Sequence, residues 1–293
     1  MPATAAPQTW TLGSLLNWTA SFLAQKGCES PRIDAEVLLA HTVGCKRIDL
    51  YGVRHGDEAS DEIRQRYREL IRKRIEGCPV AYLVGRKEFF SLELEVTPAV
   101  LIPRPDSEVA VMECLALAKP QTAPRIIDIG TGSGNLAIAI AKRHAGASVT
   151  AVDISEDALA VARRNAEKHG VGERIRFLKG DLFGAIGAGE TFDFVVSNPP
   201  YIPIAEIARL QPGVRDYEPH LALDGGPDGY RIFDRLIEAA TAFLTSGGWL
   251  IVEIGAPQEE RARERLTAHG GYVLADTVRD YSGHPRVLKA RRI

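Results

Sequence analysis

From residue 125 onward, short segments rich in β-branched and aromatic residues alternate with amphipathic helical segments, and this alternation most constrains the fold. Five segments are predicted as buried strands: RIID (125–128), SVTAVD (148–153), RIRFL (174–178), FDFVVS (192–197) and WLIVEI (249–254). Helices are predicted between most of them, for example at 156–169 and 230–244. This order is typical of a doubly wound, mostly parallel sheet with helices on both faces.

Two more strands are predicted at 272–278 and 286–290. The residues between them are too few for a crossover helix, so this pair is expected to be antiparallel. The sequence therefore predicts an α/β fold with a seven-stranded sheet whose last strand is antiparallel.

The first 85 residues carry a helical pattern instead. One helical face between residues 12 and 23 carries Leu12, Leu15, Leu16, Thr19, Phe22 and Leu23, and a second apolar stripe follows Ser60. Ser30 and Pro31 predict a helix start, with the Ser30 hydroxyl as its cap. Residues 86–104 alternate loosely and contain prolines, which is typical of an extended or hairpin linker. We thus expect a helical domain at 1–85, a linker at 86–104 and an α/β domain at 105–293.

The charge balance argues against a protein that grips nucleic acid through its phosphates. The 36 basic and 38 acidic residues give a net charge of −2, without the basic excess that such binding needs. Arginines cluster between residues 64 and 74, but acidic residues intersperse them, so we interpret this segment as a solvated helix face.

Cysteine spacing and hydropathy indicate the compartment. Cys28, Cys45, Cys78 and Cys114 form no C-x-x-C pair, so neither a metal site nor a redox dithiol is predicted. No apolar stretch approaches the ~20 residues needed to span a bilayer. The first ten residues also lack the pattern of a secretion signal. These features predict a cytoplasmic protein with free thiols.

The segment DIGTGSG (128–134) lies directly after a predicted strand and before a helix. Glycines let the backbone turn tightly and approach a ligand, although such a segment is also compatible with a simple turn. Asp153 ends the next strand, 23 positions after Gly130, where a carboxylate accepts both hydroxyl protons of a ribose. The spacing G-x-G-x-G departs from the G-x-G-x-x-G of NAD sites. Together these features favour an adenosine-containing ligand, and S-adenosylmethionine in particular.

The segment NPPY follows the fourth predicted strand of the α/β domain. In a doubly wound sheet the first and fourth strands flank the point where strand order reverses, so both motifs should open onto one crevice. Pro199 and Pro200 lack backbone donors, so the loop presents carbonyl acceptors. Asn198 adds a side-chain acceptor, with its own NH₂ left for a neighbouring backbone or cofactor oxygen, and Tyr201 adds a flat apolar face. This set suits a planar group that bears an NH₂.

An amide or aromatic amine is a poor nucleophile, because its lone pair is delocalised. Holding both N–H groups turns the lone pair toward a methyl donor. A dry pocket with carbonyl dipoles suits the dispersal of the sulfonium charge, and no strong base is required.

These motifs resemble those of the release factor glutamine methyltransferases, which methylate the glutamine of the GGQ motif in peptide chain release factors. The resemblance covers nearly the whole chain: FFSLELEVTPAVLIPRPDSE (89–108), DIGTGSG, SNPPYIP (197–203), GGPDGYRIF (225–233) and DYSGHPRV (280–287). It implies a class I S-adenosylmethionine-dependent methyltransferase domain behind a small helical substrate-recognition domain. NPPY alone is shared with other amino-methyltransferases, whereas the combination with the PRP and GGPDGYR segments is more specific.

The resemblance also implies the site residues. The cofactor would be held by Asp128, Ile129, Gly130, Thr131, Gly132, Asp153, Asp181, Leu182 and Asn198. The glutamine amide would be gripped by Asn198, Pro199, Pro200 and Tyr201, with Asn198, Pro199 and Tyr201 as the catalytic residues. Two positions depart from the family pattern: Leu182, where some members have tryptophan, and Ser107, where threonine is common.

Three other functions stay open at this point. One is a related methyltransferase that acts on a ribosomal-protein glutamine, and another is an adenine amino-methyltransferase on nucleic acid. A third is a module that senses the cofactor without turnover, against which the intact NPPY argues. As partner we expect a release factor, with no direct nucleic acid or membrane binding, and we expect a monomer.

Overall fold

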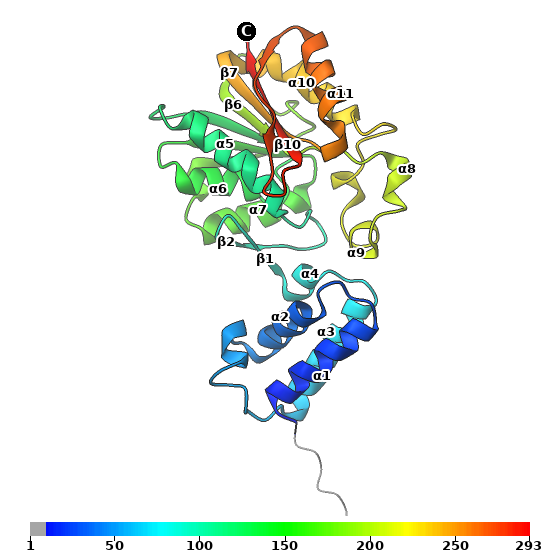
Figure 1. Ribbon diagram of the computed structural model, residues 1–293. Helices are drawn as coiled ribbons and strands as arrows, with labels where there is room; N and C mark the ends of the chain where they lie inside the picture. Colours follow the sequence, from blue (N-terminus) through cyan, green and yellow to red (C-terminus); the bar gives the residue numbers. More distant parts are fainter. Residues whose placement is uncertain (1–9) are drawn as a thin grey trace, which may run out of the picture. The chain divides into compact units, whose positions relative to one another are not determined.

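The computed structural model describes residues 10–293, so most of the segment examined for a secretion signal lies outside the described residues. The chain forms two compact units (Figure 1). One consists of Met1–Gly85 and Pro212–Tyr217, and the other of Arg86–Gln211 and Glu218–Ile293. Among the described residues, none of the helices combines the length and the apolar character needed to cross a membrane.

The first unit is helical. Its elements are α1 (Leu12–Gln25), α2 (Pro31–Val43), the 3₁₀ helix η1 (Arg47–Leu50), α3 (Asp61–Ile75), α4 (Val80–Val84) and α9 (Pro212–Arg215). The predicted apolar faces form its core, in which Leu16, Leu39 and Tyr67 are buried. The Ser60 hydroxyl accepts a hydrogen bond from the backbone N–H of Ile63, as a cap should.

The capping prediction for Ser30 is wrong, because its side chain makes no capping hydrogen bond. Its backbone has ψ of 57°, away from the extended geometry that aims a capping hydroxyl at the first turn. Pro31 does occupy the first turn of α2, as predicted.

The segment Pro212–Tyr217 was not predicted to join the helical unit. The Tyr217 hydroxyl donates to the backbone carbonyl of Glu76 at 3.2 Å. Backbone also approaches closely here, since a Cβ at Gly213 would lie 3.1 Å from the carbonyl oxygen of Gly77. The chain therefore leaves the second unit after Gln211, adds six residues to the first, and returns at Glu218.

The second unit is built on a mixed sheet. Its strands are β3 (Arg125–Ile129), β4 (Ser148–Asp153), β5 (Ile175–Lys179), β6 (Phe192–Ser197), β7 (Leu244–Glu253), β8 (Tyr272–Leu274), β9 (Val278–Arg279) and β10 (Pro285–Arg292). The order β5-β4-β3-β6-β7-β10-β8 contains the seven predicted strands, and the two-residue β9 pairs with β10. The neighbouring strands β5, β4, β3, β6 and β7 are parallel to one another. Strand β10 is antiparallel to both β7 and β8, as predicted.

The single strand predicted at 272–278 is divided into β8 and β9. Between them Arg263 donates to the carbonyl oxygen of Ala275 at 3.0 Å, a group that a continuous ladder would use. The strand predicted at 249–254 also begins earlier, at Leu244, directly after α10.

Helices cover both faces of this sheet (Figure 1). The helices and 3₁₀ helices of the unit are η2 (Pro105–Ser107), α5 (Glu108–Ala118), α6 (Asn135–Arg143), α7 (Glu156–Lys168), η3 (Gly172–Arg174), α8 (Ile204–Ile207), η4 (His220–Ala222), α10 (Arg231–Phe243), η5 (Ala256–Gln258) and α11 (Glu259–His269). One buried cluster joins the sheet to α5, α6 and α7, and another joins it to α10 and α11. Burial on both faces explains the nearly continuous apolar strand sequences.

The segment predicted as a linker packs into the second unit. It forms the hairpin β1 (Arg86–Phe89) and β2 (Leu92–Glu95), whose Phe89 and Leu94 are buried in the α5–α7 cluster. The Asn165 side chain accepts from the Glu95 backbone N–H at 2.7 Å and donates to the Glu95 carbonyl at 3.0 Å. This paired hydrogen bond fastens the hairpin to α7.

Candidate functional site

The glycine-rich loop is fastened to the end of β4. The backbone N–H groups of Gly130 and Thr131 donate to the Val152 carbonyl at 2.9 and 3.0 Å. Gly130 and Gly132 have φ of 75° and 55°, a region that favours glycine. A Cβ at either position would meet no atom of the described residues within 4 Å. Because both glycines line a cavity, a side chain there would occupy the space of a ligand.

This cavity has a volume of about 420 Å³, within the range of small-molecule sites. It lies at the carboxyl ends of β3 and β6, the neighbouring strands at which the strand order reverses. The prediction that the glycine loop and NPPY open onto one crevice is confirmed. The sequence-predicted residues on its wall are Ile129, Gly130, Gly132, Asp153, Asp181, Leu182, Asn198, Pro199 and Pro200.

Asp153 occupies the position expected for a ribose-binding carboxylate. One oxygen accepts from the Gly132 backbone N–H at 2.8 Å, and the other accepts from the Ser155 N–H at 2.9 Å. Burial raises the pKa of Asp153, although these backbone hydrogen bonds oppose the rise. Each carboxylate oxygen retains a further lone pair for a ligand hydroxyl.

Asp128 and Thr131 are not on the wall. Asp128 is fully buried and accepts from the Thr131 hydroxyl at 2.7 Å and from the Ala137 N–H at 3.2 Å. Burial raises the pKa of Asp128 to about 7. In this structure Asp128 and Thr131 stabilise the glycine-rich loop through these hydrogen bonds and do not line the cavity.

Asp181 and Leu182 line the cavity after β5. Asp181 is paired with Arg235 of α10 at 2.8 Å. Leu182 has φ of 50°, a left-handed conformation that costs a non-glycine residue ~1–2 kcal/mol. Such a cost at a cavity wall is typical of a position where side-chain placement matters.

The NPPY segment is divided between the wall and its support. Asn198, Pro199 and Pro200 line the cavity, whereas Tyr201 does not. The Tyr201 ring packs beside Gly255. The Tyr201 backbone carbonyl accepts a hydrogen bond from the Gln258 side-chain amide at 3.1 Å. Burial raises the pKa of the Tyr201 hydroxyl to about 12, so it is neutral at physiological pH.

The amide of Asn198 has a protein partner that the sequence did not indicate. Its Nδ2 donates to Ser107 Oγ at 3.1 Å. Ser107 belongs to η2 and is buried. The hydrogen bond joins two residues 91 positions apart, which no local pattern predicts.

Sequence reasoning also missed the walls supplied by residues 99–101 and 219–222. Leu101 and Pro219 line the cavity, and Glu218 directly precedes Pro219 in the sequence. Its carboxylate accepts from the Ile102 N–H at 3.2 Å and pairs with Arg104. The LIPRP motif was noticed, but its prolines indicated only an extended segment.

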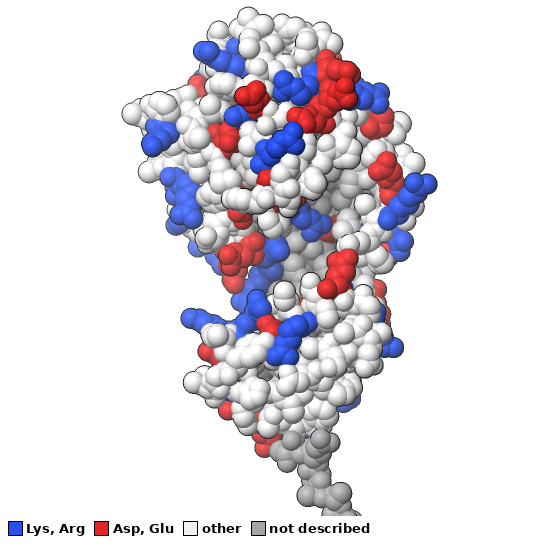
Figure 2. All heavy atoms as spheres, in the orientation of Figure 1, with Lys and Arg blue, Asp and Glu red and all other residues white. Residues whose placement is uncertain are grey.

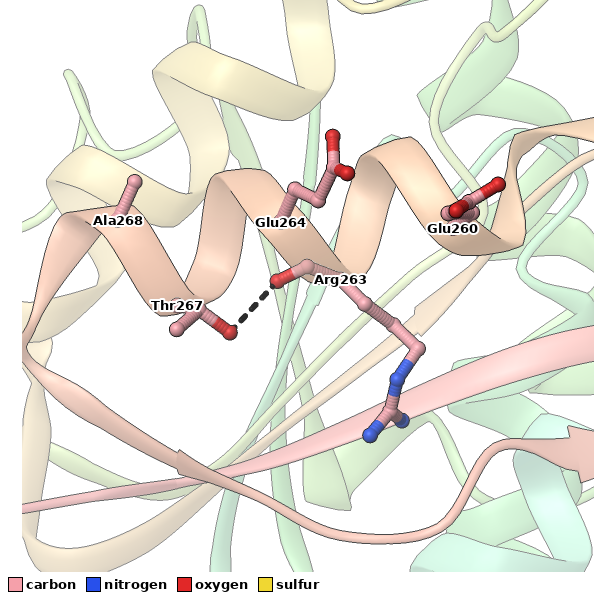
Figure 3. Close-up of a pocket in the computed structure, with 5 residues that line it drawn as sticks. All are labelled: Glu260, Arg263, Glu264, Thr267 and Ala268. Atoms are coloured by element: carbon pink, nitrogen blue, oxygen red, sulfur yellow. Dashed lines mark hydrogen bonds between the residues drawn. The ribbon is translucent and has the colours of Figure 1, made fainter.

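A second hollow lies on the surface of α11, and its wall residues all belong to that helix (Figure 3): Glu260, Arg263, Glu264, Thr267 and Ala268. Arg263 is engaged with Ala275 and Thr277. No motif of the sequence reaches this hollow, so the cavity at β3 and β6 is the candidate site.

Comparisons with known proteins identify the family of this chain. Residues 14–85 match the PrmC N-terminal domain family, and residues 109–208 match the methyltransferase small domain family. With the sheet order and the cavity, they place the chain among S-adenosylmethionine-dependent methyltransferases. A release factor glutamine methyltransferase of Rhodopirellula baltica is 42% identical and is matched over the full length of both chains. The enzyme of the same name from Salmonella typhimurium is 41% identical, covering 90% of this chain and 93% of its own. The chain belongs to the release factor glutamine methyltransferase family.

Solved structures share the fold at lower identity. A ribosomal protein L11 methylase from Lactobacillus delbrueckii aligns with a TM-score of 0.50 and 23% identity, covering 67% of this chain and 83% of its own. The hMettl16 catalytic domain, in complex with the MAT2A 3′UTR hairpin 6, aligns with a TM-score of 0.56 and 18% identity, covering 76% and 81%. At these identities the likeness concerns the fold alone.

Proposed function

We propose that the protein transfers a methyl group from S-adenosylmethionine to the side-chain amide nitrogen of the glutamine in the GGQ motif of peptide chain release factors. The observation that carries this proposal is the shared cavity: the glycine loop and Asp153 line one part of it, and Asn198, Pro199 and Pro200 line another. An adenosine-binding set and an amide-binding set thereby face the same space.

The residues present fit the cofactor. The two glycines leave room for a ligand, and Asp153 retains acceptor capacity for ribose hydroxyls. Ile129 and Leu182 offer apolar contact for an adenine ring, with Asp181 at the same border. Asp128 and Thr131 act indirectly, by holding the loop. When bound, S-adenosylmethionine supplies an electrophilic methyl group on a sulfonium.

The NPPY loop orients the nucleophile. The Asn198 side-chain oxygen and the Pro199 carbonyl accept hydrogen bonds from the two N–H groups of the substrate amide. These hydrogen bonds fix the amide plane and turn its nitrogen toward the methyl donor. Pro200 shapes the wall, and Tyr201 supports the loop through Gly255 and Gln258. The apolar wall excludes water, which favours a transition state in which charge disperses.

The first prediction concerns Asp153. Asp153→Ala is expected to weaken S-adenosylmethionine binding tenfold to a hundredfold, because losing a charge-assisted pair of hydrogen bonds costs ~1.5–3 kcal/mol. Isothermal titration calorimetry measures the affinity, with Asp157→Ala, an exposed position in the first turn of α7, as the matched control. Unchanged affinity in Asp153→Ala would remove the ribose role.

Substrate choice is tested by offering three acceptors side by side. Release factor, ribosomal protein and DNA are incubated with radiolabelled S-adenosylmethionine, and the modified residue is located by mass spectrometry. We expect label only on the release factor glutamine. Label on a ribosomal-protein glutamine or on adenine would replace the proposed substrate, and cofactor binding without any transfer would indicate a sensor.

We further propose that the protein acts as a monomer in the cytoplasm. The four cysteines are unpaired, which suits a reducing compartment. Lys and Arg are interspersed with Asp and Glu on the face seen in Figure 2, which suits a protein partner better than a nucleic acid. Light scattering at micromolar concentration tests the monomer.

A further inference from the structure

A buried carboxyl group lies behind Asn198 and has no place in the proposed mechanism. Glu253 is the last residue of β7 and is only 2% exposed. Because Ser197 pairs with Val252 in the sheet, the next residues on each strand, Asn198 and Glu253, follow at the same edge. The Glu253 carboxyl group lies close enough to the side chains of Ser107 and Asn198 for hydrogen bonding with them to lower its pKa, and its Oε2 has no hydrogen-bond partner among the described residues.

Other charged groups surround this carboxyl group without neutralising it directly. Arg286 of β10 pairs with Asp280 at 2.9 Å and with Asp106 of η2 at 3.2 Å. The guanidinium therefore acts on Glu253 through its charge, while Asp106 opposes that effect. The Tyr201 side chain also faces this group and is neutral at physiological pH. Among residues 10–293, no ion pair compensates the buried Glu253 carboxylate.

The donors and acceptors here have only one consistent arrangement when Glu253 is ionised. A carboxylate accepts hydrogen bonds and cannot donate, so in a hydrogen bond between these two side chains the Ser107 hydroxyl donates to Glu253. The Ser107 oxygen then accepts from the Asn198 Nδ2, as its 3.1 Å contact allows. With its NH₂ held on this side, Asn198 presents its Oδ1 to the cavity that it lines.

We propose that Glu253 and Ser107 are positioning residues that set the orientation of the Asn198 amide, so that its oxygen rather than its NH₂ meets the substrate amide. This inference rests on the proposed function, in which Asn198 accepts a substrate N–H. A reversed Asn198 would set its own NH₂ against the substrate NH₂, two donors facing each other.

The arrangement depends on the ionisation of Glu253. Burial raises the pKa of Glu253 to about 7, against the hydrogen bonds from Ser107 and Asn198 and the charge of Arg286. Below that pH the protonated group gains a donor, and the chain of hydrogen bonds is no longer forced into one direction. The rate constant kcat should therefore rise with pH through about 7 and level off above it.

The test compares four variants of the full chain by kcat, KM and cofactor affinity. Ser107→Thr keeps the hydroxyl and should retain kcat. Ser107→Val, whose side chain is nearly isosteric with that threonine, should lose about tenfold or more, because the hydroxyl that accepts from the Asn198 amide is lost. Glu253→Gln should lower kcat about fivefold to tenfold and remove the rise through pH 7, since glutamine both donates and accepts. Glu113→Gln, which breaks the ion pair with Lys289, is the matched control.

Stability separates positioning from a structural role. A buried acid with a raised pKa binds its proton more tightly in the folded state. The fold therefore loses stability as the pH rises from 4.5, the ordinary pKa, to about 7, and the full loss is present above that pH. Glu253→Gln should therefore melt no lower than the parent protein at pH 8 while remaining slower. A lowered melting temperature with an unchanged pH profile would overturn the proposal.

The outcome is distinguishable from a failure of the proposed function. If Asn198→Ala retains full activity, the role of Asn198 fails and this inference fails with it. If Asn198→Ala is inactive while Ser107→Val and Glu253→Gln match the parent protein in kcat and pH profile, only the positioning proposal is wrong.

Discussion

Replacing Asn198 with alanine is expected to lower kcat for release factor methylation by about 100-fold or more, the effect of removing one preorganised polar contact to a reacting group. The fold should survive, because Asn198 follows the end of β6 on the cavity wall and does not fill the core. Single-turnover methyl transfer measures the rate, and circular dichroism with a melting curve checks the fold.

Asn198→Asp is the sharper form of this test. It keeps the shape and an acceptor, but it removes the NH₂ that donates to Ser107. It also sets a second acid beside Glu253, and like charges in a buried site cannot both ionise easily. A negative charge near the sulfonium would stabilise the ground state more than the charge-dispersed transition state. We therefore expect kcat to fall even if the cofactor binds more tightly.

Cofactor affinity serves as the control for both variants. Because Gly132 and Asp153 on the wall are unchanged, binding of S-adenosylmethionine to Asn198→Ala should stay within a few-fold of the parent protein. If Asn198→Asp turns over release factor at the parental kcat, Asn198 does not position the amide.

The sheet was predictable because its signals are local and repeated. Buried parallel strands are apolar along their whole length, so FDFVVS and SVTAVD stand out without knowledge of their neighbours. The adjacency of β3 and β6 then follows from the winding of the fold. That adjacency predicted the shared cavity, and with it Asp153 and Asn198.

The supporting residues were not predictable in the same way. Ser107, Glu218 and Glu253 are single polar residues whose roles arise from distant parts of the sequence. Ser107 and Asn198 are 91 positions apart, Ile102 and Glu218 are 116 apart, and Glu253 lies beside both Ser107 and Asn198. No periodicity marks such a residue. Tyr201 shows the converse: NPPY indicated a flat face for the substrate, yet packing beside Gly255 keeps its ring off the wall.

The last prediction concerns the helical unit, which we propose as the docking surface for the release factor. The substrate amide has three non-hydrogen atoms, and even the best small ligands gain only ~1.5 kcal/mol per atom. The cavity alone would then bind the amide with about 4.5 kcal/mol, which corresponds to a dissociation constant on the order of 1 mM. A protein substrate at cellular concentration needs further contacts.

The helical unit has suitable residues for such contacts. Trp18 stacks on Phe22 and is half exposed, and Ile48 is 71% exposed. Tyr51 lies under Arg32, which also hydrogen-bonds to Asn17, so side chains from α1, α2 and the end of η1 gather around one arginine. Exposed aromatic and arginine side chains are enriched where proteins bind each other.

Deleting residues 1–85 should therefore abolish methylation of intact release factor while cofactor binding stays measurable, because the residues that line the cavity all belong to the second unit. The deletion also removes Gly77 and Glu76, which contact Pro212 and Tyr217. A point substitution in the full chain is therefore tested as well. In the full chain, Ile48→Asp should raise KM for release factor about tenfold and leave kcat and cofactor affinity unchanged. Val273→Asp, an exposed apolar position of the second unit, is the matched control. Full-rate methylation of intact release factor by the truncated chain would show that docking does not use the helical unit.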